Sequence, residues 1–478
     1  MHLELQKIRK GIVGLSARIH TPFGTKKLVY ADWTATGRLY QPIEEKMLKE
    51  FGPYIGNTHT NATATSRMMT ELYGEARTAI KRHVGADETD VLLPCGSGMT
   101  SAVVTLQSLL HLRKSEGGKM ARASDRPIVF VTHMEHHSNH TTWLETICDV
   151  EVIPAGSDGL PSHDGLATLL QHYESRPLKI AAVTAASNVT GAIIDVHAIA
   201  RVMHAHGGLC FVDYASAAPY LPIAMHPRDT QASLDAIYFS PHKFLGGVGT
   251  PGILVFGAHL YKNDVPQRPG GGTVHWTNPW GGRSYLEDIE TREDGGTPPF
   301  WGVIKTALAF DLKERMGQKH IRAREHELVD AMFVRLGRIP DLHILAPHIR
   351  HRLATFAFTI NGLHYALVTR LLNDRFGIQT RSGCACAGTY GHTLFGVSQE
   401  ESHRITAMID AGDESQRPGF VRISLHPTTT DTELEFITEA LAQIAQKGSV
   451  WAKHYVYDKA TNEFTHRLDK KPRPKLRI

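Results

Sequence analysis

The chain has 478 residues, of which 42% are hydrophobic and 21% charged, which is typical of a globular protein long enough for more than one domain. Its formal net charge is only +4, and five basic side chains gather after Asp469, so the rest is close to neutral and we expect no nucleic-acid partner. The chain shows neither an apolar run near ~18 residues nor a secretory h-region, and its five cysteines are unevenly spaced, so we expect a cytoplasmic protein without a membrane partner.

Short runs rich in β-branched residues alternate with amphipathic stretches in the first half of the chain. The expected strands are 90–94, 127–133, 149–155, 178–186, 209–215, 235–240 and 252–257, and the expected helices are 101–114, 166–175 and 196–207. This alternation predicts a mostly parallel sheet with helices on both faces. In such sheets ligands bind beyond the carboxyl ends of the strands.

The second half of the chain is organised differently. Two segments rich in glycine and proline, 266–283 and 293–302, are predicted to be loops. A helix is expected over 303–316, and after residue 341 the pattern is that of an α+β unit, with strands 343–347, 354–360 and 420–425 and a helix 365–374. We therefore predict an N-terminal segment (1–29), a large domain (30–305), a small C-terminal α+β domain (306–453) and a basic tail (454–478).

Unusual polar residues stand at the carboxyl ends of the expected strands. Ser97 and Gly98 open a helix after one strand, where free N–H groups and the helix dipole would hold a phosphate. Asp213 ends an apolar strand, and Lys243 follows another and precedes a glycine cluster. Each alone has a simpler interpretation: a helix start, an N-cap or buried ion pair, and a surface lysine. Together, a nucleophilic lysine, a buried carboxylate and a phosphate site predict pyridoxal phosphate.

An ordered series of motifs between about Val29 and Ile444 resembles the class V aminotransferase family of fold-type I pyridoxal-phosphate enzymes. The motifs include YADWTATG, GSGMTSA, MEHHSN, SNVTG, VDYASA, SPHKFLGG, PGGGT, TRSGCACAG and VRISLHPT. The branch that they resemble most is that of the cysteine desulfurases and selenocysteine lyases. The resemblance implies an α/β fold: a large domain with a mostly parallel sheet sandwiched by helices, and a smaller α+β C-terminal domain.

The resemblance also implies roles for individual residues. Lys243 would form a Schiff base with the cofactor and shuttle the proton at the substrate α-carbon, and Asp213 would pair with the pyridinium nitrogen. His136 would stack on the ring and serve as an acid–base group, and Arg422 would clamp the substrate carboxylate. The remaining cofactor contacts implied are Asn188 and Ser216 near the ring hydroxyl, Ser97, Gly98, Ser240 and His242 at the phosphate, and Thr273 reaching the phosphate from the partner subunit of a homodimer. In the desulfurases a longer side chain usually replaces Ser216.

The cysteine loop decides which branch the chain resembles. Cys386 of TRSGCACAG falls on the sulfur-accepting cysteine of the family, and Cys384 lies two residues before it. A thiolate at Cys386 would take the sulfur of a cysteine substrate and leave alanine and an enzyme persulfide, which a sulfur-acceptor protein could then collect. The plainer interpretation is that these are small buried cysteines of the core.

Other functions stay open at this stage. A transaminase, an epimerase or a selenocysteine lyase acting on another amino acid would use the same cofactor. A metal-dependent hydrolase is the remote alternative, because HMEHHSNH carries His133, His136, His137 and His140, and Cys384, Cys386 and His392 could also gather a metal. The chain has no HExxH motif, which argues against that alternative.

Overall fold

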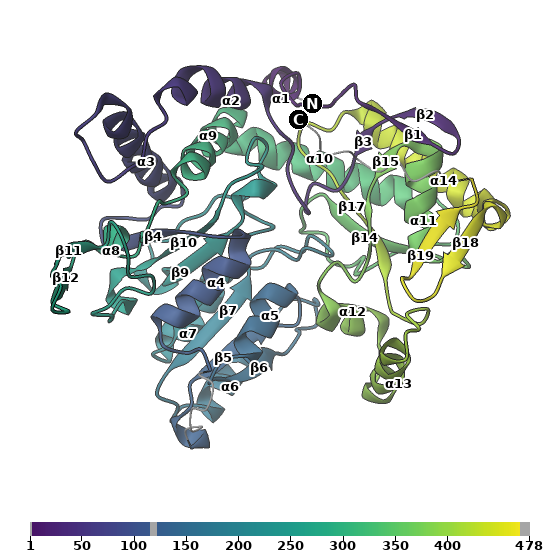
Figure 1. Ribbon diagram of the computed structural model, residues 1–478. Helices are drawn as coiled ribbons and strands as arrows, with labels where there is room; N and C mark the ends of the chain where they lie inside the picture. The colour runs from purple at the N-terminus through teal and green to yellow at the C-terminus, as the bar shows by residue number, and fades with distance from the viewer. Residues whose placement is uncertain (1, 115–121, 469–478) are drawn as a thin grey trace.

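The computed structural model describes residues 2–114 and 122–468 (Figure 1). The basic side chains from Lys470 onward, which were predicted to form a tail, therefore lie outside the described residues. Within these two ranges, no helix has the length and apolar character needed to cross a membrane.

The central sheet has seven strands in the order β4-β10-β9-β8-β7-β5-β6. Their bounds are Asp90–Cys95 (β4), Ile128–Thr132 (β5), Asp149–Ile153 (β6), Lys179–Thr184 (β7), Leu209–Asp213 (β8), Ala236–Phe239 (β9) and Gly252–Gly257 (β10). Strands β5 to β9 are parallel to one another, whereas β10 is antiparallel to both β4 and β9. The seven predicted strands and the mostly parallel sheet are confirmed.

Helices cover both faces of this sheet, and the side chains of β5 show how. Val129 and Val131 pack into the cluster that contains α4 and Trp143 of α5, whereas Ile128 and Phe130 pack into the cluster that contains α6 and α7. This alternation is the period-2 geometry of a strand buried on both sides. The four helices named are Gly98–Leu109 (α4), His137–Leu144 (α5), His163–His172 (α6) and Val196–Ala205 (α7). The other helices of this part of the chain are Gln41–Lys46 (α2), Ala64–His83 (α3), Ile289–Arg292 (α8) and Phe300–Met316 (α9).

A second, four-stranded sheet lies in the C-terminal part of the chain, in the order β13-β14-β17-β16. Gly317, at φ +78°, separates α9 from α10 and lets the chain turn towards this sheet. The elements here are Gln318–Leu336 (α10), Leu342–Ile344 (β13), Thr355–Ile360 (β14), Tyr365–Leu371 (α11), Ile378–Gln379 (β15), Arg381–Gly383 (β16), Gly388–Phe395 (α12), Gln399–Asp410 (α13), Phe420–Ser424 (β17) and Asp431–Trp451 (α14).

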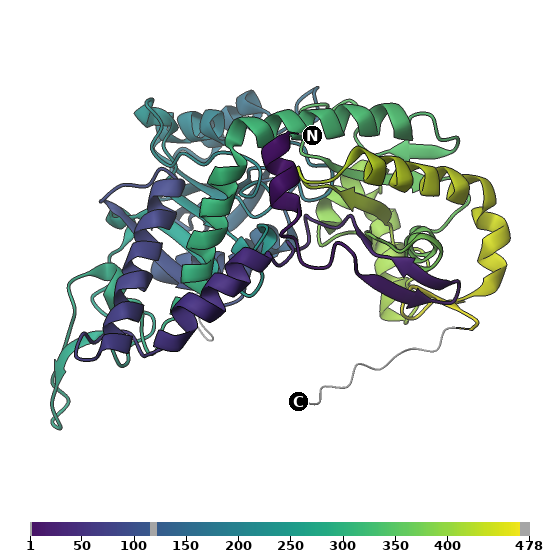
Figure 2. The ribbon, with the colours of Figure 1, turned by 90° about the horizontal axis from the view of Figure 1, so that it is seen from above.

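The N-terminal residues pack with the C-terminal sheet. Val29 and Ala31 belong to the same hydrophobic cluster as Val421 and Ile423, and β3 pairs in parallel with β15. Figure 2 shows the β1–β2 hairpin lying beside the C-terminal half of the chain. The elements are Leu3–Arg9 (α1), Arg18–Thr21 (β1), Gly24–Lys27 (β2) and Val29–Tyr30 (β3).

One prediction of irregular structure was wrong. Within 266–283, Val274–Thr277 (β11) pairs with β12 (Arg283–Tyr285), because Asn278 Oδ1 accepts the N–H groups of Trp280 and Gly282 and closes the turn. At the C-terminus, Tyr455–Asp458 (β18) and Glu463–His466 (β19) form a second hairpin, and Phe464 packs against the small-sheet core. The predicted helix 365–374 is α-helical only to Leu371 and continues as a π-helical turn.

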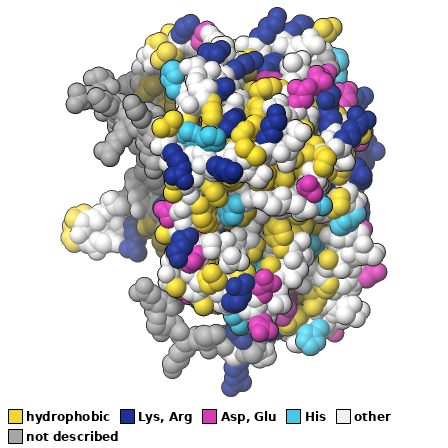
Figure 3. All heavy atoms as spheres, turned by 90° about the vertical axis from the view of Figure 1, so that its right-hand side faces the viewer, with side chains coloured by type: hydrophobic (Ala, Val, Ile, Leu, Met, Phe, Trp, Pro, Cys, Tyr) yellow, Lys and Arg dark blue, Asp and Glu magenta, His cyan; other side chains and the backbone are white. Residues whose placement is uncertain are grey.

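The side of the molecule that carries the small sheet is chemically mixed. Figure 3 shows Lys and Arg side chains spread over this face, with Asp, Glu and His side chains between them. The division of the chain at residues 305 and 306 into a large and a small domain stays a prediction.

Candidate active site

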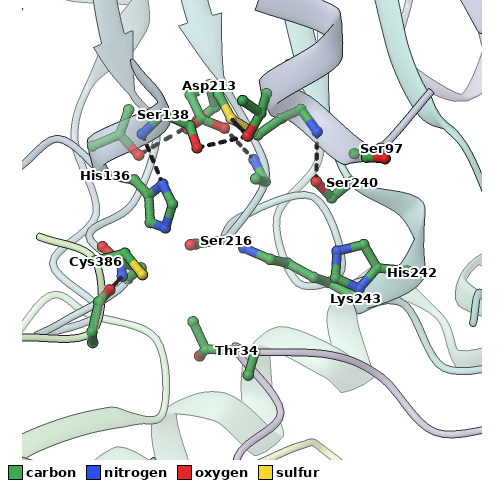
Figure 4. A pocket seen from close by; sticks show the side chains of 18 of the residues that line it. Thr34, Ser97, His136, Ser138, Asp213, Ser216, Ser240, His242, Lys243 and Cys386 are labelled. Carbon is green, nitrogen blue, oxygen red and sulfur yellow. Dashed lines mark hydrogen bonds between the residues drawn. The ribbon is translucent and has the colours of Figure 1, made fainter. Parts of the chain in front are cut away.

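A cavity of about 400 Å³ lies where the carboxyl ends of the central strands meet the C-terminal sheet. Its lining comes from both halves of the chain: strand ends of the central sheet contribute Asp213, Ser240 and Lys243, whereas Cys386 and Arg422 come from the C-terminal part. Figure 4 shows Asp213, Ser240, Lys243 and Cys386 arranged around one space. The predicted site residues that line it are Ser97, Gly98, His136, Asn188, Asp213, Ser216, Ser240, His242, Lys243, Cys386 and Arg422.

One end of the cavity is formed by backbone N–H groups and hydroxyls. Gly98 begins α4 with φ +63°, and a Cβ at this position would lie 2.9 Å from Ser240 Oγ, so only glycine fits between the helix and β9. Ser240 Oγ also accepts the N–H of Met99 at 2.8 Å. Because a helix N-terminus carries partial positive charge, this end suits an anion such as a phosphate.

His242 contributes a neutral ring to the same end. Burial, followed by the charge of the adjacent Lys243, lowers the pKa of His242 to about 4. Its Nδ1 lies 3.1 Å from the hydroxyl of Thr36, which leaves Nε2 for other partners. Behind it, Gly252 of β10 approaches α4 so closely that a Cβ there would lie 2.0 Å from the carbonyl oxygen of Gly98.

Asp213 and Lys243 supply buried charge of opposite sign. The Asp213 carboxylate accepts the N–H of Ala215 at 2.8 Å, and burial raises its pKa to about 6 although Ala215 and Lys243 act to lower it. Burial likewise lowers the pKa of Lys243 to about 8, and the charge of Asp213 is the largest influence that raises this pKa. The amine therefore titrates near neutral pH, as a group that gains and loses protons must.

His136 caps α5 and points into the cavity. Its Nδ1 accepts the N–H of Ser138 at 3.1 Å, so Nε2 carries the proton of the neutral ring. Burial, and then the charge of Lys243, lowers the pKa of His136 to about 3. At neutral pH the cavity thus contains an uncharged imidazole with a flat apolar face.

Arg422 lies at the opposite end, on β17, and it is already paired. Its Nη2 donates to Asp32 Oδ1 at 2.6 Å and its Nη1 donates to the carbonyl of Asn188 at 3.0 Å, while its buried Nε has no partner within the described residues. Burial lowers the pKa of this guanidinium, and Asp32 is the largest influence that opposes the change. The sequence interpretation missed Asp32, although it stands in the quoted motif YADWTATG.

Asn188 connects the cavity with the cysteine loop. Its Nδ2 donates to the carbonyl of Ala385 at 2.7 Å. Its Oδ1 is buried and has no hydrogen-bond partner within the described residues. A buried acceptor without a partner is costly, so this oxygen is available for a donor on a bound molecule.

The cysteine loop joins β16 to α12 in a strained conformation. Ala385 and Cys386 have φ values of +49° and +58°, and the N–H of Ala387 donates to the carbonyl of Cys384 at 3.0 Å. Two successive positive φ angles closed by such a bond describe a type I′ turn, which non-glycine residues adopt at a cost of about 1 kcal/mol or more each. The N–H of His137 donates to the carbonyl of Cys386 at 2.7 Å and holds the turn against α5.

Cys386 faces the cavity beside an arginine that the predicted site omitted. Arg381 Nη2 lies 4.0 Å from Cys386 Sγ, and both side chains line the cavity. The sequence did offer a signal for Arg381, because this residue stands five positions before Cys386 in the motif TRSGCACAG. Cys384 is half-buried and is not among the lining residues.

Thr273 is the one predicted site residue that does not line the cavity of the chain. It is buried, and its hydroxyl donates to the carbonyl of Gly270 at 2.7 Å and accepts the N–H of the same residue at 3.0 Å. Because its predicted role concerns a partner subunit, that role stays a prediction.

The histidines of HMEHHSNH do not gather around a metal position. His133 contacts the carbonyl of Gly159, His137 Nε2 accepts the N–H of Gly388, and His140 contacts Thr389. Likewise, His392 is bonded to Gly388 and Ser402 rather than joined to the two cysteines. Of residues 2–114 and 122–468, only Asp87, Asp90 and His226 form a group of three close ligating side chains, far along the chain from the predicted set.

Comparison with known proteins agrees with this geometry. The family model of aminotransferase class V matches residues 29–437. A probable cysteine desulfurase of Halalkalibacterium halodurans is 28% identical over 364 residues, covering 75% of this chain and 84% of that protein, and one of Streptomyces coelicolor is 27% identical over 389 residues, covering 80% and 88%. An apo cysteine desulfurase structure from Thermococcus onnurineus matches with a TM-score of 0.73 at 23% identity, covering 92% of this chain and 98% of that one, which shows that the fold is shared.

Proposed function

Because the chain belongs to the aminotransferase class-V family, we propose that it is a pyridoxal-phosphate-dependent cysteine desulfurase that converts cysteine to alanine and leaves the sulfur as a persulfide on Cys386. The observation that carries the proposal is that a cysteine, Cys386, lines the same cavity as Lys243, Asp213 and Arg422. A transaminase would need no thiol there. The relatives named above as probable cysteine desulfurases support the same substrate.

The residues of the cavity fit pyridoxal phosphate. Lys243 would hold its aldehyde carbon, Asp213 its ring nitrogen, and the flat face of His136 its ring. The end formed by Ser97, Gly98, Ser240 and His242 would hold the phosphate, and the unpartnered Oδ1 of Asn188 could accept from the ring hydroxyl, with Ser216 beside it. When bound, the cofactor supplies an electron sink for the substrate α-carbon.

The chain's own residues would then orient the substrate and move its proton and sulfur. Arg422 would bind the substrate carboxylate, sharing its guanidinium with Asp32, and its unpartnered Nε is a free donor. Lys243, whose pKa lies near 8, would take the proton from the α-carbon and return one on the way to alanine. Cys386 would attack the substrate sulfur, with Arg381 stabilising its thiolate.

Several further features belong to the same proposal. The enzyme would act as a homodimer, with Thr273 reaching the phosphate in the partner's cavity, and a sulfur-acceptor protein could collect the persulfide. A cytoplasmic setting agrees with the cysteines, because all five are free in the structure. The large-domain and small-domain division would place the cavity between the two domains.

The proposal is tested by adding cysteine to the cofactor-loaded protein and measuring alanine and sulfide. We expect both products in the presence of a reducing thiol, and we expect Cys386→Ser to lose them while retaining the absorbance band of the bound cofactor. Cys148→Ser, which changes a buried cysteine that does not line the cavity, is the matched control. A cofactor band without alanine, combined with turnover of another amino acid, would instead favour a transaminase or an epimerase.

A further inference from the structure

We propose that Cys384 and Cys386 form a two-thiol relay, in which the sulfur received by Cys386 inside the cavity passes to Cys384 and is presented from there to an outside thiol. The inference rests on the proposed function, because Cys386 must first hold a persulfide. It adds a second sulfur-carrying residue and names the chemical class of the acceptor, a thiol that does not enter the cavity.

The turn that carries the two cysteines keeps them within exchange distance. Consecutive Cα atoms are ~3.8 Å apart, so the Cα atoms of Cys384 and Cys386 lie no more than about 7 Å apart, and the turn shortens this further. Bonded cysteines have Cα atoms ~4.4–6.8 Å apart. A persulfide extends the donor by one S–S bond of ~2 Å. The backbone of the turn therefore places the two Cα atoms at a separation that sulfur exchange can span, and the two side chains must rotate towards each other for the transfer.

The two thiols face different surroundings. Cys386 lines the cavity, and Figure 4 shows its side chain at the edge of that space. Arg381 Nη2 lies 4.0 Å from its sulfur. Cys384 is half-buried, as Cys386 is, but it does not line the cavity, and its charge acts on Arg417, whose pKa is raised first by its hydrogen bond to Glu414 and then by Cys384. The two sulfurs therefore differ in place, one at the cavity and one outside its lining.

The anchoring of Cys386 explains why a second thiol would be useful. The His137 N–H holds the Cys386 carbonyl, and Asn188 holds the carbonyl of the preceding Ala385. The backbone of Cys386 cannot move out towards an acceptor without breaking these bonds. The carbonyl of Cys384 is bonded to the N–H of Ala387 and, among the described residues, to nothing outside the turn. The sulfur could therefore leave the cavity while the loop stays in place.

The transfer is a balanced thiol exchange. The thiolate of Cys384 attacks the outer sulfur of the Cys386 persulfide, a new S–S bond forms at Cys384, and the old S–S bond at Cys386 breaks. The electron pair of the broken bond stays on Cys386 Sγ as a thiolate, and the proton of the persulfide remains with the transferred sulfur. The step consumes no oxidant or reductant, and it regenerates Cys386 for the next substrate.

A single-turnover experiment on the cofactor-loaded protein tests the relay. The protein receives one equivalent of cysteine without other thiols, is alkylated with iodoacetamide, and the peptide that carries both cysteines is sequenced by mass spectrometry. We expect the extra sulfur on Cys386 first and on Cys384 later. In a second step, glutathione is added and the loss of protein-bound sulfur is timed. We expect Cys384→Ser to form alanine and the Cys386 persulfide but to discharge it several-fold more slowly.

Three outcomes separate the relay from the proposed function. If the cofactor binds but neither alanine nor a persulfide forms, the proposed function fails, and the relay fails with it. If the sulfur stays on Cys386 and Cys384→Ser discharges as fast as the wild type, the relay fails while the proposed function stands. If Cys386→Ser still forms a persulfide on Cys384, Cys384 takes sulfur directly from the substrate and the relay order is overturned.

Matched variants guard against an effect of altered folding. Ser382→Ala changes a half-buried side chain of β16, two residues before Cys384, and should discharge the persulfide at the wild-type rate. Arg417→Gln keeps both thiols but removes the guanidinium beside Cys384, so we expect it to slow the second step and to leave the first unchanged. An unaltered cofactor band in each variant shows that the cavity is intact.

Discussion

The two ends of the cavity are built in opposite ways. The end that carries Ser97, Gly98 and Ser240 consists of strand ends and the first turn of α4, and its close contacts are between backbone atoms. The end that carries Cys386 is a turn with two non-glycine residues at positive φ, held by hydrogen bonds to α5 and Asn188. The comparison teaches that one end of the cavity is fixed by the sheet and a helix start, whereas the other is a loop in which strain is stored, and in the proposed function the first would hold the cofactor and the second would deliver sulfur.

The largest effect that sharpens this comparison is expected at the rigid end. Lys243→Ala should abolish the absorbance band of covalently held cofactor and reduce alanine formation by roughly 10²–10⁴-fold through the lost proton transfer alone. Absorbance and alanine assays with added pyridoxal phosphate measure both. A variant that kept the band and the rate would mean that the lysine after β9 is not the attachment point.

The second largest effect is expected when a backbone contact of the rigid end is disturbed. Gly252→Ala places a Cβ 2.0 Å from the carbonyl oxygen of Gly98, so we expect a loss of about 1–3 kcal/mol in the free energy of unfolding and weaker cofactor binding. Urea unfolding and cofactor titration measure these. The control is Gly74→Ala on α3, where nothing lies within 4 Å of the new Cβ and helix propensity predicts about 0.5–1 kcal/mol of stabilisation. Equal stability of the two variants would contradict the packing argument.

The third effect concerns His136 and the loss of folding stability in acid. Its pKa is lowered to about 3 in the folded protein, so between pH 6.5 and 3 the unfolded state binds more protons and stability is lost as pH falls. Removing the imidazole in His136→Asn should therefore recover about 2 kcal/mol or slightly more of the stability that the cofactor-free wild type loses between pH 7 and pH 4.5. Urea unfolding at the two pH values gives the difference, and parallel curves for both proteins would show that His136 does not titrate this way.

The smallest expected effect lies in the cysteine loop. Ala385→Gly removes a side chain held at φ +49° and should raise the free energy of unfolding by about 0.5 kcal/mol, because the relieved strain exceeds the entropy that glycine adds to the unfolded chain. Ala357→Gly in the buried strand β14 should instead lower it by about 0.5–1 kcal/mol or more. If both changes destabilise the protein, the loop is not strained.

Much of the rigid end could be predicted from the sequence, because its signals are local. Asp213 and Lys243 each follow a run of buried apolar residues, and a parallel sheet brings such strand ends to one edge. The hairpin β11–β12 was missed because glycine and proline outweighed a short Val-His-Trp-Thr run, whose pairing depends on the side chain of Asn278. Arg381 was missed although it stands five residues before Cys386, because that spacing does not show that the two side chains meet across the loop.

The sequence by itself determined the seven central strands, the helix start at Gly98 and the presence of a lysine, an aspartate and a cysteine in recognisable motifs. Only the tertiary structure decided that Asp32 pairs with Arg422 across 390 residues, and that the Cys386 turn is anchored on α5 and on Asn188. The physical reason is that strands and caps follow from the period and type of neighbouring residues, whereas an ion pair or a loop anchor depends on atoms that meet only after the two sheets have packed.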